Sequence, residues 1–144
     1  MNLRKRIVVG VLSAAFVSGS TLLAEPASAG DSCSSGYHCV FYLDIGSSKH
    51  SYFDSDSNFT NDTFGNGAVV NDNVESASNS STGGYESHYY YDINYGGGLV
   101  FCVNPGHTVH NSQLSDDGVP GNGAFQWNEA SSLKLRPTTT IRCY

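Results

Sequence analysis

Four cysteines constrain what this chain can fold into more than any other feature of its sequence: Cys33, Cys39, Cys102 and Cys143. In a chain that leaves the reducing cytoplasm, an even number of cysteines is typical of disulfides, here two. Three pairings are possible and the sequence does not choose among them, although one would join Cys33 to Cys39 as a local clamp and Cys102 to Cys143. A zinc site is disfavoured because no C-x2-C pair is present.

The first 29 residues are typical of a secretory signal peptide. A positive start, an apolar core and a small-residue cleavage site follow one another at residues 4–6, 7–17 and 27–29. The apolar core is shorter than the roughly 20 residues of a membrane span. We therefore expect a secreted, extracellular mature domain of residues 30–144, with no membrane as its partner.

The mature domain is strongly acidic. Outside the expected signal peptide the chain has four lysines and arginines against twelve carboxylates, a net charge of −8. This charge repels phosphates, so nucleic acid is disfavoured as a partner. The charge suits a soluble monomer whose partner is a basic protein or a divalent cation.

Short aromatic and β-branched runs between turn residues predict an all-β fold. The mature chain is rich in Gly, Asn, Ser and Asp and poor in helix formers. Strands are predicted at residues 37–43, 49–53, 74–78, 86–92, 99–103, 131–135 and 139–143. Turns are predicted at residues 44–48, 94–98, 104–106 and 118–123. Many short strands at this spacing indicate a sandwich or barrel.

The mature chain also repeats itself. Residues 37–53 and 87–101 each contain an aromatic strand, an Asp-containing turn with glycine, and a strand that ends in Phe. Further on, residues 71–79 and 126–134 both place Asn before a strand start rich in Glu, Ser and Ala. Two units of about fifty residues predict a pair of Greek-key motifs.

The second unit resembles the βγ-crystallin Greek key. Tyr90, Tyr95 and Gly97 fit its aromatic-x4-aromatic-x-Gly corner, where two aromatic rings stack across a folded hairpin and glycine permits the backbone angle. The first unit has Ser47 and Lys49 in place of the second aromatic and the glycine. Within that superfamily, CSSGYHCVFY, YDINYGGGLVFCVNPG and WNEASSLKL resemble peptidase inhibitor family I36. The resemblance implies a disulfide-stapled, crystallin-like β-domain that is not an enzyme.

The resemblance also implies an inhibitory loop. The family has a Cys-Val step in its reactive loop, so this role falls on Cys102 and Val103, followed by Asn104 and Pro105. A disulfide can anchor Cys102, Pro105 fixes a backbone angle, and Val103 offers the apolar side chain that thermolysin-type metalloproteases favour. A rigid loop of this kind loses little entropy on binding. The family's type member closes the loop with a second cysteine where this chain has His107. We therefore expect an inhibitor of extracellular proteases, with a metalloprotease as the partner.

The crystallin resemblance implies a possible calcium site as well. Its motif, (Asn/Asp)-(Asn/Asp)-x-x-(Ser/Thr)-Ser, presents hard oxygens to a hard cation, and Asp72, Asn73 and Ser76 match it. In the second unit Trp127 stands where an oxygen ligand is needed. The alternative is a strand start whose side chains bond their own backbone. No other cofactor is expected. A calcium-binding crystallin module without inhibitory activity and a killer-toxin-like secreted module are the alternative functions.

Patterns typical of enzymes are absent from the sequence. It contains no G-x-S-x-G elbow, no H-E-x-x-H helix and no phosphate-binding loop. His107 and His110 are three residues apart, a spacing that places them on opposite faces of a strand, so surface histidines are expected rather than a metal pair.

Overall fold

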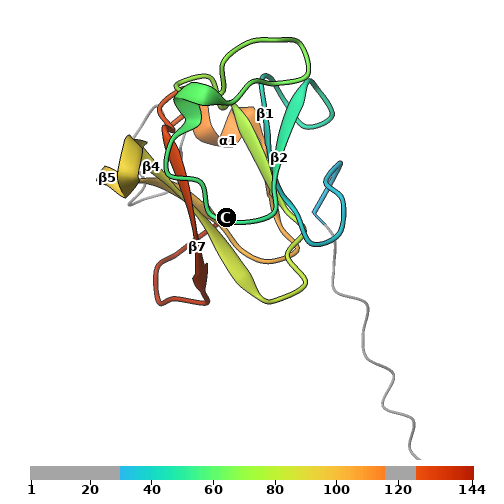
Figure 1. Cartoon of the computed structure of the whole chain (residues 1–144). Coiled ribbons are helices and arrows are strands. Elements are labelled where there is room, and N and C mark those ends of the chain that lie inside the picture. The colour runs from blue at the N-terminus through green and yellow to red at the C-terminus, as the bar shows by residue number, and fades with distance from the viewer. Residues whose placement is uncertain (1–29, 116–125) are drawn as a thin grey trace, which may run out of the picture.

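The computed structural model describes residues 30–115 and 126–144. This part of the chain folds into two antiparallel sheets (Figure 1). The predicted all-β class is therefore confirmed. The expected signal peptide and the expected turn at 118–123 lie outside the described residues. None of the described helices has the length and apolar character needed to cross a membrane.

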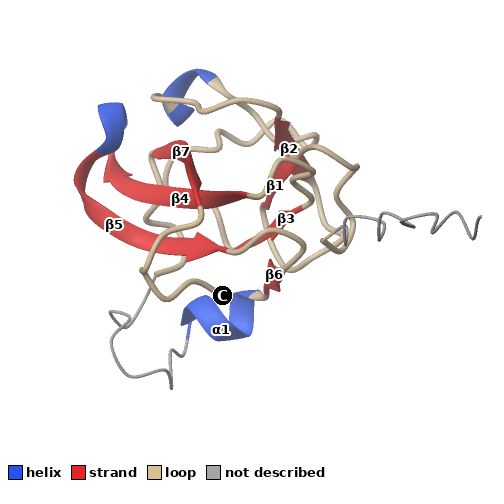
Figure 2. Cartoon of the chain, turned by 90° about the horizontal axis from the view of Figure 1, so that it is seen from below, coloured by secondary structure: helices blue, strands red, loops and turns tan. Residues whose placement is uncertain are grey.

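The first sheet has the strand order β2-β1-β3-β6 and the second has the order β5-β4-β7. The strands of the first sheet are β1 (His38–Phe41), β2 (Lys49–Tyr52), β3 (Ser76–Asn79) and β6 (Thr108–Val109). Those of the second sheet are β4 (Tyr85–Asp92), β5 (Gly96–Val103) and β7 (Ser132–Pro137). Figure 2 shows the long strands β4 and β5 on one side of the molecule and β1, β2 and β3 on the other.

Each sheet receives a short piece of chain from the other half of the sequence. β6 follows β5 along the chain, yet it pairs with β3 in the first sheet. Conversely, Asp56 follows β2 and forms a bridge with Leu133 of β7 in the second sheet. These two crossings tie the sheets together. The assignment of the two units to Greek-key motifs stays a prediction.

Six of the seven predicted strands are present with shifted ends, and the seventh, at 139–143, is wrong because that segment is irregular. The backbone N–H of Thr139 donates to the side chain of Glu86 instead of to a neighbouring strand. The predicted turn at 94–98 is partly strand, since β5 begins at Gly96. Four short elements were not predicted: β6, η1 (Phe59–Asn61), η2 (Ile93–Tyr95) and α1 (Asn111–Ser115).

The two aromatics of the second unit's corner are in contact as expected, but their rings do not stack. The rings of Tyr90 and Tyr95 meet edge to face with their centroids 6.0 Å apart. Gly97 has φ +71°, and a Cβ there would lie 2.7 Å from the Asp92 carboxylate and from the Tyr91 Cβ. Glycine is therefore required at this position both for its backbone angle and for the space.

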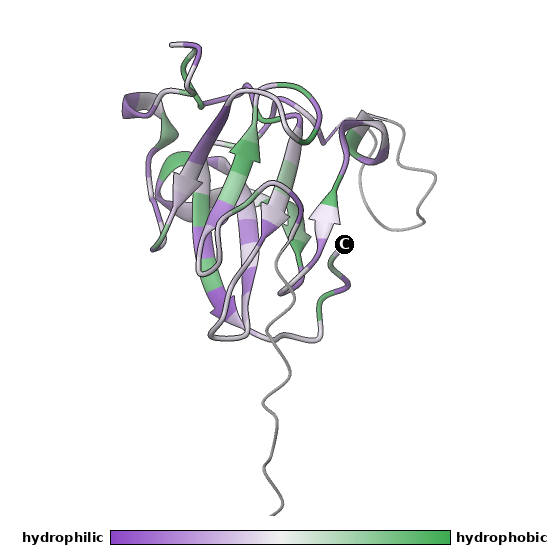
Figure 3. Ribbon diagram, turned by 90° about the vertical axis from the view of Figure 1, so that its right-hand side faces the viewer, coloured by the Kyte–Doolittle hydropathy of each residue, from purple (hydrophilic) through white to green (hydrophobic). Residues whose placement is uncertain are grey.

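The hydrophobic core contains residues of both sheets and of the loop between β2 and β3. Tyr89 of β4 stacks on Phe101 of β5 with ring centroids 4.5 Å apart, and Tyr52 of β2 stacks on Phe59 of the loop at 5.0 Å. Figure 3 shows apolar segments on the strands beside polar ones. Buried aromatics contribute much of the stability of a domain of this size, because each ring removes a large apolar area from water.

Candidate functional site

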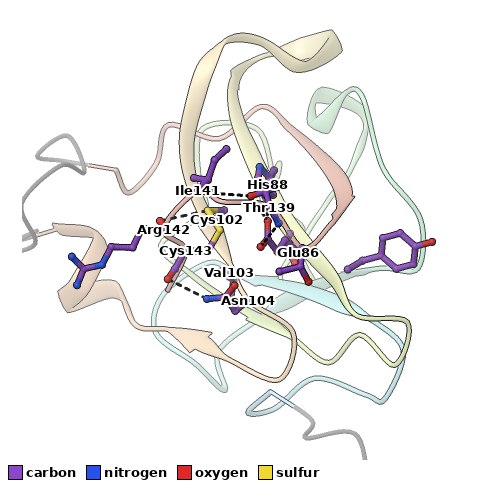
Figure 4. Close-up of polar contacts among 12 residues, drawn as sticks. Glu86, His88, Cys102, Val103, Asn104, Thr139, Ile141, Arg142 and Cys143 are labelled. Atoms are coloured by element: carbon purple, nitrogen blue, oxygen red, sulfur yellow. Dashed lines mark hydrogen bonds and ion pairs between the residues drawn. A yellow bond between two sulfur atoms is a disulfide. The ribbon is translucent and has the colours of Figure 1, made fainter.

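Both disulfides are formed, and of the three possible pairings the protein has Cys33–Cys39 and Cys102–Cys143. The first joins cysteines 6 residues apart beside β1, whereas the second joins cysteines 41 residues apart. The second bridge fastens the C-terminal segment to β5, next to the expected inhibitory loop (Figure 4).

The expected inhibitory loop begins inside the core. Cys102 is 2 % exposed, and the side chain of Val103 is completely buried among the core residues. The expectation that Val103 offers its side chain to a protease is therefore wrong. The physical reason is that β5 is covered on both faces at its end: the core packs on one face, and the C-terminal segment held by Cys143 lies on the other.

The chain becomes accessible directly after Val103, in the turn between β5 and β6. Asn104 and Pro105 are half-buried there and His107 is exposed. Backbone N–H groups of the turn donate to fixed partners, from Asn104 to Tyr144 O at 2.8 Å and from His107 to Asn104 O at 3.1 Å. We call residues 104–107 the β5–β6 turn.

The β5–β6 turn is also bonded to β3 and to the C-terminal segment. Gly106 N–H donates to Asn79 O at 2.8 Å, and Asn79 N–H donates to His107 O at 2.9 Å. The Asn104 side-chain amide donates to Cys143 O at 3.2 Å. The turn is therefore held from two sides in one conformation, half-buried except for the exposed His107.

A buried carboxylate fixes the C-terminal segment from below (Figure 4). Glu86 and His88 of β4 are 1 % and 0 % exposed, and the His88 Nε2–H donates to Glu86 Oε2 at 2.7 Å. The Thr139 N–H and hydroxyl donate to the same carboxylate at 2.9 and 2.8 Å. Burial raises the pKa of Glu86, but the hydrogen bonds from His88 and Thr139 outweigh it and bring this pKa below its ordinary value.

No pattern in the sequence predicted this carboxylate as part of the site. Glu86 and His88 are two residues apart on a strand, so their side chains point to the same face. Two polar residues on one face normally indicate the solvent side of a strand. A local pattern cannot show that the C-terminal segment covers this face.

The expected calcium ligands do not converge. Asp72 is exposed at the end of a loop, and its carboxylate accepts from the Ser131 hydroxyl at 3.1 Å. The Asn73 amide donates to Val69 O, and the buried Ser76 hydroxyl donates to Leu43 O. Asp72 alone faces a side chain of the second unit.

The two histidines of the β6 region lie in different surroundings. His110 Nδ1 is 3.0 Å from the Asp44 carboxylate, while His107 stands in the β5–β6 turn. Within residues 30–115 and 126–144, the one group of three potential metal ligands is His88 with Cys102 and Cys143. Those two cysteines are bonded to each other, so this group is not a metal site.

One of three comparisons with known proteins gave a match. The profile of peptidase inhibitor family I36 matches residues 26–102, more than half of the chain. The matched part contains β1 to β4 and all of β5 except its last residue, Val103, so it ends before the β5–β6 turn. Searches of curated proteins and of solved structures gave no match. The disulfide-stapled β-domain and the matching profile lead to one conclusion: the chain belongs to peptidase inhibitor family I36.

Proposed function

We propose that this protein is a secreted, non-catalytic inhibitor of an extracellular metalloprotease, and that the β5–β6 turn enters the protease cleft. Membership of the inhibitor family supports a protease as the partner. The observation that favours the turn is its anchoring: it is accessible, while its backbone bonds to Asn79 on one side and to Tyr144 on the other. The signal peptide expected from the sequence favours export, and a protease outside the cell is the partner that an exported inhibitor meets.

Anchoring favours inhibition for an entropic reason. A flexible segment loses conformational freedom when it enters a protease cleft. In the β5–β6 turn this loss has already occurred during folding, because Pro105 restricts φ and the Cys102–Cys143 bridge fixes the preceding strand. A segment held in this way also resists cleavage, since its ends cannot separate after the cut.

An exposed imidazole supports a metalloprotease as the target. A catalytic zinc keeps an open coordination position for water or substrate, and neutral imidazole is one of its preferred ligands. His107 is exposed at the end of the β5–β6 turn. We propose that its ring approaches the metal of the protease when the turn fills the cleft.

Titration of a thermolysin-class metalloprotease with purified mature protein, residues 30–144, tests the proposal. Protease activity on a peptide substrate is expected to fall in proportion to added inhibitor and to approach zero near equimolar amounts. His107→Ala should weaken inhibition at least tenfold, because the zinc-directed ring is lost. The matched control is His110→Ala, which removes another exposed imidazole close by that lies outside the turn.

Two outcomes would contradict the proposal. If the protease keeps its full activity in the presence of micromolar mature protein, the protein is not an inhibitor of that metalloprotease class. Inhibition that is equally strong in the wild type and in His107→Ala would leave the inhibitor function standing but exclude His107 as the group that meets the metal. A parallel titration of a serine protease shows whether the effect is specific for metalloproteases.

A calcium-binding function is the second candidate, because each unit contains a buried side-chain oxygen that lacks a hydrogen-bond donor. Among the described residues, Asn71 Oδ1 and Asn128 Oδ1 are buried and accept no hydrogen bond. Asp72 and Asn128 share the same left-handed backbone, with φ of 56° and 57°. A hard cation is one way to satisfy such oxygens. Asp72 and Ser131 contribute further oxygens from the two units.

Calorimetry with calcium chloride distinguishes this function from inhibition. If the site exists, the mature protein should release or absorb heat on binding about one equivalent of calcium, and Asp72→Ala should abolish the signal. Asp92→Asn is the control, since Asp92 is exposed at the far end of β4. No heat in the wild type would end the calcium hypothesis and leave the inhibitor proposal unaffected.

A further inference from the structure

A cleft of about 430 Å³ opens at the edge of the molecule, where the end of β2, the loop between β3 and β4, and β7 meet. Its floor contains His38 and Leu135, its rim contains hydroxyl groups and one carboxylate, and two aromatic rings form its walls. No residue of the β5–β6 turn lines it. The proposed inhibitory function therefore leaves this cleft without a role.

His38 gives the cleft a polar floor. Its side chain is 98 % buried, and its Nδ1 is 2.6 Å from the hydroxyl of Ser87, which is itself completely buried. Nε2, on the opposite side of the ring, has no hydrogen-bond partner among the described residues. Burial lowers the pKa of His38 to about 4, so the imidazole is neutral above that pH. The floor therefore holds an unused polar atom and no positive charge.

Both aromatic walls lie beside glycines. A Cβ at Gly83 would stand 2.9 Å from the Tyr85 ring, which is too close for a side chain, whereas a Cβ at Gly36 would make an ordinary contact with the Phe53 ring at 3.8 Å. Both rings remain accessible, with Phe53 64 % and Tyr85 44 % exposed. Large exposed aromatics beside a cleft are typical of binding surfaces.

Asp54 supplies the only charge in the lining of the cleft. It is exposed, and within the described ranges it has neither a salt bridge nor a side-chain hydrogen bond. Two cations of β7, Lys134 and Arg136, alternate with Leu135, so their side chains point to the other face of the sheet. The cleft therefore combines an unpaired negative charge with two aromatic faces.

We propose that this cleft binds the arginine side chain of a protein partner. A guanidinium group is planar, stacks on aromatic faces and pairs with a carboxylate through two parallel N–H donors. Phe53 and Tyr85 provide the faces, Asp54 provides the carboxylate, and the hydroxyls of Ser55 and Thr82 provide further acceptors. The neutral His38 below does not repel the cation. The net charge of the mature domain, −8, also attracts a basic partner.

A small probe tests the cleft without knowledge of the partner. N-acetyl-arginine amide is titrated into the ¹⁵N-labelled mature protein, and amide chemical shifts are followed by NMR. Saturable shifts are expected for residues 53–55 and 81–85, and they should weaken as salt is added. N-acetyl-citrulline amide, the neutral analogue of nearly the same shape, should bind at least tenfold more weakly.

Variants then assign the interaction. Asp54→Asn and Phe53→Ala change exposed side chains and should each weaken arginine binding several-fold without altering the fold. Asp92→Asn removes another exposed carboxylate, at the other end of β4, and should leave binding unchanged.

Equal binding of the arginine and citrulline probes, or of wild type and Asp54→Asn, would overturn the proposal. So would saturation by methyl glucoside in place of the arginine probe, which indicates a sugar site. Protease titration is independent, so either function can fail alone.

Discussion

Removal of the Cys102–Cys143 bridge is expected to lower the free energy of unfolding of the mature domain by about 4 kcal/mol. The bridge closes a loop of 41 residues, and the entropy that such a loop removes from the unfolded chain has this magnitude. The double variant Cys102→Ala/Cys143→Ala should therefore unfold at much lower urea concentration. Its melting temperature should fall by roughly 15 °C, since one kcal/mol corresponds to about 4 °C in a domain of this size.

The other bridge provides the matched control. Cys33 and Cys39 close a loop of only 6 residues, so their double replacement by alanine should cost about 2 kcal/mol. Both pairs lose two sulfurs, and both contain buried cysteines, so the comparison isolates loop length and position. If loss of the short bridge lowers the free energy of unfolding as much as loss of the long one, loop entropy does not explain why the Cys102–Cys143 bridge is stabilising.

The long bridge should also matter for inhibition. It lies two residues before the β5–β6 turn and fixes the segment whose carbonyls bind Asn104. At a temperature where the Cys102→Ala/Cys143→Ala variant is still folded, we expect weaker inhibition than in the Cys33→Ala/Cys39→Ala variant. The reason is that the turn loses its support on one side and must be ordered during binding.

Strands and the aromatic corner could be predicted because the signals are local. Alternating aromatic and β-branched residues bounded by Gly, Asn and Asp identified six strands to within a few residues. The contact between the rings of Tyr90 and Tyr95 beside Gly97 could be predicted from the motif, since the ring pair and the required glycine lie within one hairpin. The burial of Val103 also had a local signal: Leu99 to Val103 is an uninterrupted apolar run, which is typical of a strand covered on both faces.

The remaining features depend on contacts between distant parts of the chain. Residues 139–143 have the composition of a strand, but their partner is a side chain 53 residues earlier rather than a neighbouring strand. The arginine cleft likewise combines Asp54 after β2, Tyr85 at the start of β4 and His38 of β1. No spacing in the sequence reveals which loops meet, so such sites require the structure.

Replacement of Glu86 by alanine is expected to destabilise the mature domain by about 3 to 5 kcal/mol. The carboxylate accepts hydrogen bonds from His88 and from two groups of Thr139, and its loss leaves the buried His88 donor and the half-buried Thr139 donors without this partner. The C-terminal segment should then detach between β7 and the disulfide. Urea unfolding gives the free energy, and hydrogen exchange of the Thr139 amide shows whether that segment opens first.

The same carboxylate should make stability depend on pH. In the folded protein the pKa of Glu86 lies below its ordinary value, because the hydrogen bonds from His88 and Thr139 outweigh the opposing effect of burial. The unfolded chain therefore binds a proton at a higher pH than the folded protein does, and stability decreases as pH falls from about 4.5 toward the folded pKa. Glu86→Gln should remove this part of the acid transition. Glu129→Gln, at an exposed position, should preserve it and change stability by less than about 0.5 kcal/mol.

An unchanged dependence of stability on pH in Glu86→Gln would show that Glu86 is not ionised in the native protein. The C-terminal segment would then be held by a neutral acid, which can donate as well as accept, and its fastening would not weaken on acidification.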